Sequence, residues 1–126
     1  MSTAIVLAPT ILVVDARAAS RMHAACLIRN RWPDARVEEA NDGISALAAV
    51  AEGGFDLVIV ELAGEAGLAL AQRLRQDRPA CQVALLAEPG TAATRRRADQ
   101  SGVRLFRSPM TGDVVEQVLA LVGLDD

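Results

Sequence analysis

Two apolar runs that each end in a carboxylate dominate the hydrophobic pattern of this chain. Residues 11–14 are apolar and lead into Asp15, and in the stretch 55–61 four consecutive apolar residues lead into Glu61. Such runs, without polar alternation, are typical of strands buried on both faces, as in a parallel sheet covered by helices. Ligands of open α/β sheets bind beyond the carboxyl ends of the strands. Both carboxylates are therefore predicted to lie at the functional edge of one sheet.

The rest of the chain alternates between strand-like and helix-like periods, separated by short connections. The strands are predicted at residues 10–15, 35–40, 55–61, 82–86 and 103–106. The helices are predicted at residues 16–31, 44–52, 68–78, 91–100 and 114–122. Five such alternations favour a doubly wound α/β sheet, because crossovers between parallel strands are right-handed. One domain is expected over residues 10–123, with a flexible leader at 1–9 and a tail at 124–126.

Two of the predicted helices have a core face that the apolar spacing identifies. On the first helix Ala19, Met22 and Cys26 are expected to mark this face, with Ala18, Ala25 and Ile28 beside it. On the second helix the face is expected to consist of Ile44, Leu47, Ala48 and Val50. Cys26 and Cys81 both lie in apolar segments without metal or redox spacing. They are therefore interpreted as small core residues of a reduced protein.

Composition and charge exclude several classes of function. The chain has 126 residues, a length typical of one domain, and its formal net charge of −3 gives this domain no general attraction for nucleic acid. No apolar run reaches the roughly 18 residues of a membrane span, and the N-terminus lacks the charged start of a signal peptide. A cytoplasmic location is expected. All 13 cationic residues are arginine, so the chain contains no lysine.

Four segments together resemble the receiver domain of response regulators, the phosphoacceptor module of two-component signalling. They are residues 11–15, residues 38–43 (Glu-Glu-Ala-Asn-Asp-Gly), residues 55–60 and the Ser108-Pro109 pair. Their order and spacing match the family from residue 10 to residue 122. The resemblance implies a flavodoxin-like (βα)5 sheet with strand order 2-1-3-4-5. It also implies a role in bacterial two-component or phosphorelay signal transduction.

The metal and acceptor positions that the resemblance assigns hold different residues in this chain. Asp15 matches the first of two acids that hold Mg²⁺ in the family, but the second position is Ala16, and the phosphoacceptor position is Glu61. The loop after Glu61 lacks the usual Met-Pro, and Gly67 arrives about two residues early. Two carboxylates could form only a loose Mg²⁺ site. The extra methylene of glutamate moves the acceptor, and errors of about 1 Å can cost roughly 100-fold in rate.

The switch positions implied by the resemblance also differ. The hydroxyl residue after the fourth strand falls on Ala87, the lysine before the last proline on Ser108, and the switch aromatic on Leu105. Arg107 is next to Ser108 but should point the other way, because side chains alternate along a strand. We therefore expect a pseudo-receiver that acts without phosphorylation and without enzymatic activity. The alternatives are weak Mg²⁺-dependent phosphorylation at Glu61, and a Glu61 that mimics the phosphorylated state.

An arginine cluster provides the second candidate site. Its members are Arg95, Arg96, Arg97, Arg104 and Arg107. In the family, the fourth helix, the fifth strand and the last helix form the face used for dimerisation and output contacts. The cluster is therefore a candidate contact for a homodimer, a histidine kinase or an output protein. Arginine also suits phosphate, so an anionic nucleotide is an alternative ligand, and a solvated helix face is the simplest interpretation. An unrelated enzyme is disfavoured because no base or nucleophile accompanies the carboxylates.

Overall fold

A single parallel sheet organises the protein, whose computed structural model describes residues 8–88 and 90–124. Its strands are β1 (Thr10–Asp15), β2 (Arg36–Ala40), β3 (Leu57–Glu61), β4 (Gln82–Ala87) and β5 (Arg104–Arg107). All neighbouring strands pair in parallel, in the order β2-β1-β3-β4-β5. This order confirms the predicted fold class. It also places the carboxyl ends of β1 and β3 side by side in the middle of the sheet.

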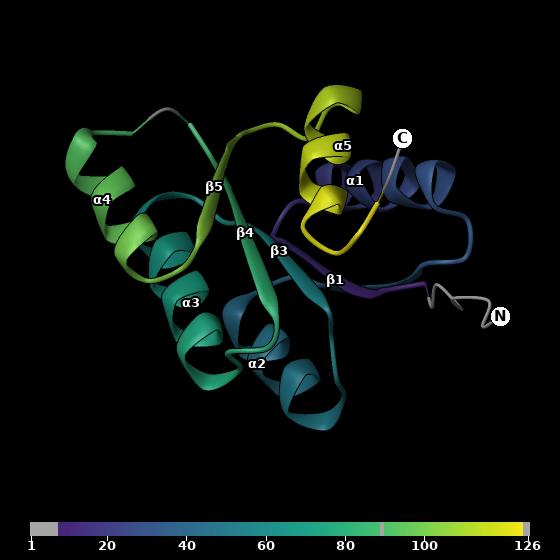
Figure 1. Ribbon diagram of the computed structural model, residues 1–126, viewed down its shortest axis with the longest axis horizontal. Coiled ribbons are helices and arrows are strands. Elements are labelled where there is room, and N and C mark those ends of the chain that lie inside the picture. Colours follow the sequence, from purple (N-terminus) through teal and green to yellow (C-terminus); the bar gives the residue numbers. More distant parts are fainter. Residues whose placement is uncertain (1–7, 89, 125–126) are drawn as a thin grey trace, which may run out of the picture.

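Helices cover both faces of the sheet (Figure 1). They are α1 (Ala18–Arg31), α2 (Gly43–Glu52), α3 (Gly64–Asp77), α4 (Ala92–Gln100) and α5 (Gly112–Ala120). In Figure 1, α2, α3 and α4 lie on one side of the strands, and α1 and α5 lie on the other. Within the described residues, no helix is both long enough and apolar enough to cross a bilayer. The expected leader and tail fall largely outside the described residues.

The alternation of side chains along the two central strands divides the core into two layers. Leu12 and Val14 of β1 pack into the cluster that contains residues of α2 and α3, whereas Ile11 and Val13 pack into the cluster that contains residues of α1 and α5. All four side chains are almost completely buried. Continuous apolar runs are thus required because both faces of these strands are covered.

The core faces predicted for α1 and α2 are correct only in part: Ala25, Ile28 and Val50 are buried as predicted, but other members of these faces are exposed. Met22 is 62% exposed and Cys26 is also exposed, while the buried residues of α1 are Ala24, Ala25 and Ile28. Ile44 is 83% exposed, and α2 buries Ala46 together with the predicted Val50. Both helices are rich in alanine, so the spacing of large apolar residues does not define one face. The direction in which each helix leaves its strand decides which face meets the sheet.

The start of α3 is the largest difference in element boundaries. The predicted loop reaches Gly67, but the helix begins at Gly64, which has a positive φ of 65°. Gly67 therefore lies in the first turn of α3, and a Cβ atom there would approach the carbonyl oxygen of Leu62 to 2.3 Å. Only glycine lets this turn pack so closely on the connection from β3. The other predicted boundaries agree within two residues.

Candidate functional site

The carboxylates of Asp15 and Glu61 lie at the same level of the sheet edge, because these residues are register partners on β1 and β3. Asp15 is 1% exposed, and the Glu61 side chain is 11% exposed. They line a cavity of about 620 Å³, called here the acidic pocket. Its lining residues include Asp15, Ala16, Arg17, Glu61, Glu65, Ala87, Glu88, Thr94 and Ser108. The cavity thus brings together five positions that the sequence analysis named, together with Arg17 and Thr94, which it did not name; the five are Asp15, Ala16, Glu61, Ala87 and Ser108.

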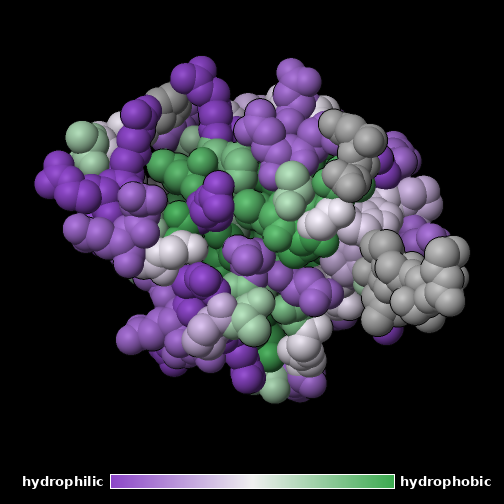
Figure 2. Space-filling model, in the orientation of Figure 1, coloured by the Kyte–Doolittle hydropathy of each residue, from purple (hydrophilic) through white to green (hydrophobic). Residues whose placement is uncertain are grey.

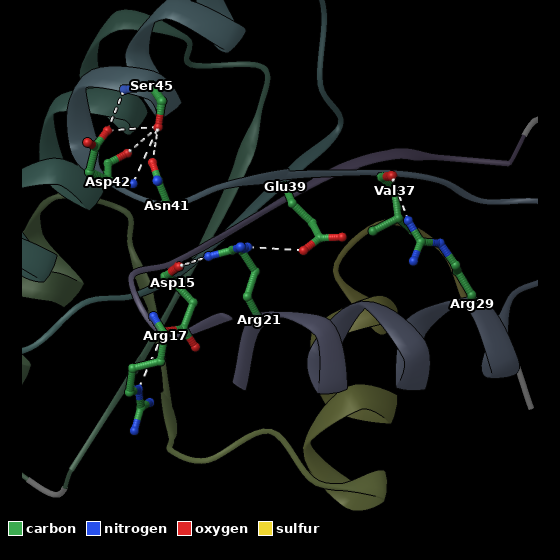
Figure 3. A network of polar contacts seen from close by, with 9 residues as sticks. All are labelled: Asp15, Arg17, Arg21, Arg29, Val37, Glu39, Asn41, Asp42 and Ser45. Carbon is green, nitrogen blue, oxygen red and sulfur yellow. Dashed lines mark hydrogen bonds and ion pairs between the residues drawn. The ribbon is translucent and has the colours of Figure 1, made fainter. Parts of the chain in front are cut away.

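Arg17 is the cation of the acidic pocket, and sequence analysis did not single it out. Its Nη2 donates to Oε2 of Glu61 at 2.7 Å, and its Nε lies 3.5 Å from Oδ1 of Asp15. Its backbone N–H also donates to Oδ1 of Asp15 at 2.9 Å. Arg17 is the residue immediately before α1, so the turn from β1 into α1 brings it to the carboxylates, and Figure 3 shows it beside Asp15. An arginine two residues after a strand-terminal acid is the signal that could have revealed it.

Two acids of the pocket, Asp15 and Glu61, have different electrostatic environments. Burial and then the negative charge of Asp15 raise the pKa of Glu61 above its ordinary value, while the Arg17 guanidinium acts in the opposite direction. Oδ2 of Asp15 is buried and has no hydrogen-bond partner among the described residues. One exposed guanidinium therefore neutralises two largely buried carboxylates only in part.

A second arginine from α1 reinforces the same edge without entering the acidic pocket. Arg21 donates through Nη1 to the backbone carbonyl of Asp15 at 2.9 Å and through Nε to Oε1 of Glu39 at 3.0 Å. Figure 3 shows this guanidinium between the end of β1 and β2. Its contacts are a backbone carbonyl and a different carboxylate, so Arg21 fixes α1 to the two strands. Among the described residues, Arg17 is the cation whose side chain contacts the carboxylates of both Asp15 and Glu61.

The donor set of the acidic pocket does not fit Mg²⁺. This ion requires near-octahedral oxygen ligands and is usually bound by one or two carboxylates together with phosphate and water. Here Ala16 replaces one acid, and an oxygen of each remaining carboxylate faces the guanidinium of Arg17. Within the described residues, no group of three potential His, Cys, Asp or Glu ligands surrounds a common point. The unpartnered Oδ2 of Asp15 is a feature that a cation would satisfy.

Two of the three switch positions meet at the acidic pocket. Ala87 ends β4, and Ser108, whose peptide bond to Pro109 is cis, donates its backbone N–H to the carbonyl of Ala87 at 3.1 Å. Both residues line the pocket. Leu105 does not line it; this side chain is half-buried and packs on the core cluster beside α3 and α4. The pocket thus lacks the ammonium group and the strand-terminal hydroxyl of the family.

Thr94 brings a hydroxyl to the acidic pocket that sequence analysis missed. It lies in the first turn of α4, where its backbone N–H donates to the capping hydroxyl of Thr91 at 3.2 Å. The two hydroxyl oxygens are also 3.2 Å apart. Because α4 follows β4 at the same sheet edge, its first turn overhangs the pocket. The Thr91 cap, three residues before, was a signal that could have placed this hydroxyl.

A second cavity, called here the arginine groove, lies between α4 and β5 and has a volume of about 660 Å³. Its charged lining includes Arg95, Arg96, Arg104 and Arg107, and its apolar lining includes Ala92, Ala98, Val103, Leu105 and Phe106. Figure 2 shows hydrophobic surface between the hydrophilic side chains of the α4 and α5 regions. The acids Glu88 and Asp99 also line the groove, which thus combines an apolar floor with sides that carry four arginines and two carboxylates.

The arginines of the predicted cluster have two different environments. Among the described residues, Arg95, Arg96, Arg104 and Arg107 form no ion pair with an acid. Arg97 does not line the groove, and its Nη2 donates instead to Oε1 of Glu65 on α3 at 2.5 Å. The Arg97 guanidinium is therefore engaged in an ion pair within the domain. The four groove arginines keep their hydrogen-bond donors available to a partner.

Comparisons with known proteins agree with this geometry. The family described as response regulator receiver domain matches residues 11–107. A CheY-like receiver domain protein from Methanospirillum hungatei is 18% identical, with a TM-score of 0.80 over 91% of this chain and 94% of that chain. A Thermotoga maritima response regulator is 24% identical, with a TM-score of 0.76 over 94% of this chain and 100% of that chain. At these identities the two structures show a shared fold.

A longer regulator also contains a similar unit. NtrX from Brucella abortus, determined in complex with ADP, is 26% identical, with a TM-score of 0.77. The match covers 91% of this chain but 26% of that protein. A comparison with curated protein sequences finds no match. The similarity therefore concerns the receiver-like unit and not the remainder of the longer protein.

Proposed function

This chain belongs to the response regulator receiver domain family, and from that premise we propose that it is a pseudo-receiver which signals through protein contacts without being phosphorylated. Receiver domains interact with kinases or output domains. The proposed partner is a histidine kinase, an output protein or a second copy of the chain, within cytoplasmic two-component or phosphorelay signalling in bacteria. In this role the domain has no catalytic activity of its own.

The arginine groove is the observation that carries the proposal. Four arginines that form no ion pair with an acid in the described part of the chain stand around an apolar floor that includes Leu105 and Phe106. Protein interfaces typically combine a desolvated apolar centre with a polar rim, and arginine is enriched in them. The cationic rim favours a partner that carries carboxylates, because complementary charge speeds encounter and selects among partners. An acidic protein surface with an apolar anchor fits this groove.

The acidic pocket supports independence from phosphorylation. Transfer of a phosphoryl group depends on positioning and on neutralising the charge of its oxygens. The pocket has Ala16, Ala87 and Ser108 where the family has an acid, a hydroxyl and an ammonium group. The acceptor carboxylate of Glu61 is already paired with Arg17. A phosphoryl group added to Glu61 would therefore meet two further negative groups, Asp15 and Glu88, and one cation.

Partner binding can be tested with matched charge reversals. The purified chain, immobilised, should retain partners from the native host that salt elutes, because exposed charge pairs are screened over about 8 Å at physiological ionic strength. The double variant Arg95→Glu with Arg96→Glu should lose them. Arg97→Glu is the matched control, because that residue faces Glu65 and lies outside the groove. Equal losses in both variants, or retention by the double variant, would contradict the role of the groove.

Phosphorylation is tested directly with a small phosphodonor. Incubation with acetyl phosphate and MgCl₂, followed by intact-mass measurement, should add no phosphate to the wild-type chain. Glu61→Asp provides the comparison in which the family's acceptor residue is restored. A phosphate located on Glu61 of the wild type would contradict the proposal and favour a weak Mg²⁺-dependent phosphoacceptor.

An anionic nucleotide is the second candidate ligand of the arginine groove. The specific observation in its favour is again the set of four groove arginines, since guanidinium groups bind phosphate through paired hydrogen bonds. Calorimetric titration with adenine and guanine nucleotides, with inorganic diphosphate as a control, tests this alternative. Saturable binding that Arg104→Gln weakens and Arg97→Gln leaves unchanged would favour the nucleotide. Absence of heat with every nucleotide would leave the protein partner as the occupant.

A further inference from the structure

We propose that Arg17 is the resident cation of the acidic pocket: its guanidinium takes the neutralising role of a divalent metal ion, and its removal converts the pocket into a metal-binding site. The inference arises from the mismatch between the pocket and Mg²⁺ described above. It concerns how two carboxylates are neutralised. Its test is therefore independent of which partner or ligand the arginine groove binds.

The first argument is the position of the guanidinium between the two carboxylates. Arg17 is 2.7 Å from Oε2 of Glu61 and 3.5 Å from Oδ1 of Asp15. These contacts bring one positive charge to the two carboxylates that β1 and β3 deliver side by side. A guanidinium is permanently protonated in proteins, so this charge is present at every accessible pH. The pocket thus needs no ion from solution for its partial neutralisation.

The second argument is that a backbone hydrogen bond fixes the position of Arg17 in the turn before α1. The Arg17 N–H is fixed on Oδ1 of Asp15 at 2.9 Å, while the side chain is 67% exposed and contacts Ser20 Oγ at 3.3 Å. Truncating this side chain leaves the turn and its hydrogen bond in place. Because Asp15 and Glu61 are largely buried, removing their cationic partner should lower stability, and the truncated protein is expected to fold with a lower unfolding midpoint than the wild type. Arg21 cannot replace the lost charge, because its guanidinium is engaged by the Asp15 carbonyl and by Glu39.

The third argument is the orphan oxygen of the pocket. Oδ2 of Asp15 is buried and has no hydrogen-bond partner among the described residues, and a buried polar atom without a hydrogen bond is costly. Without Arg17, this oxygen and the carboxylate of Glu61 would both be open to a cation. One or two carboxylates completed by water are the usual protein ligands of Mg²⁺. Removal of the guanidinium would thus leave Asp15 and Glu61 as two carboxylate ligands for a cation whose remaining ligands are water.

The test compares the thermal unfolding of the full chain in EDTA, in MgCl₂ and in MnCl₂, with NaCl matching the ionic strength. The wild type should be indifferent to both metals. Arg17→Ala should be stabilised by them, since a ligand at about ten times its dissociation constant shifts the folding equilibrium about tenfold. Arg73→Ala is the matched control: its side chain is 64% exposed and pairs with Asp77 at 3.0 Å, outside the acidic pocket. This control should not respond.

Two further measurements keep the inference falsifiable. Adding Asp15→Asn to Arg17→Ala should abolish the metal response, because it removes the buried charge. If Arg17→Ala is too unstable to measure, Arg17→Gln carries the same comparison. Calorimetry with MgCl₂ should show binding to the Arg17 variant and none to the wild type. Equal binding to both, or no metal response in either Arg17 variant, would overturn the inference.

Discussion

Arg17 donates a 2.7 Å hydrogen bond to Glu61, 44 residues further along the chain, and this pair occupies the centre of the acidic pocket. The contact exists because β1 and β3 are adjacent and in register, so Asp15 and Glu61 end side by side. Arg17 then follows Asp15 into the turn before α1. The phosphoacceptor position of this receiver is therefore held by an internal ion pair.

Glu61 should make stability depend on pH in the mildly acidic range. The fold raises its pKa above 4.5, so the folded state binds more protons than the unfolded state between 4.5 and the raised value. The stability that this group contributes is complete below pH 4.5 and is lost as the pH rises through the folded pKa. Chemical denaturation across this window should show a fall that Glu61→Gln removes.

The control for this pH dependence is Glu65, whose pKa is lowered because Arg97 hydrogen-bonds to it. Its contribution has the opposite sign: it is present above the ordinary pKa and lost as the pH falls. Glu65→Gln should therefore leave the slope above pH 4.5 unchanged. If wild type and Glu61→Gln have parallel pH profiles, the Glu61 carboxylate is not held in the environment described here.

Gly67→Ala should destabilise the protein by about 1–3 kcal/mol, the usual cost of forcing an extra methyl into a packed site. The added Cβ would lie 2.3 Å from the carbonyl oxygen of Leu62, so the first turn of α3 must shift away from the β3 connection. Gly112→Ala is the matched control, because nothing lies within 4 Å of its added Cβ. Urea titration of both variants measures the difference, and equal stabilities would contradict this packing.

The core face of α1 can be checked with two truncations on one helix. Ile28→Ala removes a completely buried side chain and should cost about 2–5 kcal/mol. Met22→Ala truncates a side chain that is 62% exposed and should stay within about 0.5 kcal/mol of wild type. Denaturant midpoints compare the two. The reverse ranking would mean that Met22, and not Ile28, packs in the core.

The two cysteines should differ sharply in reactivity. Cys81 is buried, and burial, followed by the charge of Asp56, raises its thiol pKa to about 11. Its thiolate fraction at neutral pH is then roughly one in ten thousand. Cys26 is exposed on α1 and should react with a maleimide within minutes, whereas Cys81 should react only on unfolding. Cys26→Ser should abolish labelling of the native protein; if labelling persists, Cys81 is accessible.

The strands were the most predictable part of the structure. Val13 and Ile59 belong to runs that can be buried on both faces only in a helix-covered parallel sheet, and the structure places them there. Glu61 was likewise predictable as a strand-terminal carboxylate. These inferences succeed because they depend on local period and length, which a linear sequence contains.

The helix faces and the partners of the site were less predictable. Ile44 and Met22 have the hydrophobicity of core residues, but the crossovers turn other faces of α2 and α1 toward the sheet. Thr94 lines the acidic pocket because α4 begins at the edge of the sheet where β1 ends. Each of these outcomes depends on how separate elements are oriented, and orientation is a property of packing.

By itself, the sequence determined the class of fold, the strand order through its family resemblance, and the chemical groups missing at Ala16, Ala87 and Ser108. Tertiary structure alone decided that Arg17 neutralises Glu61 and that Arg97 turns to Glu65 while its neighbours line the arginine groove. The physical reason is distance. Charge pairing acts through space over a few ångströms, and residues 44 or 32 positions apart come within that range only after the chain has folded.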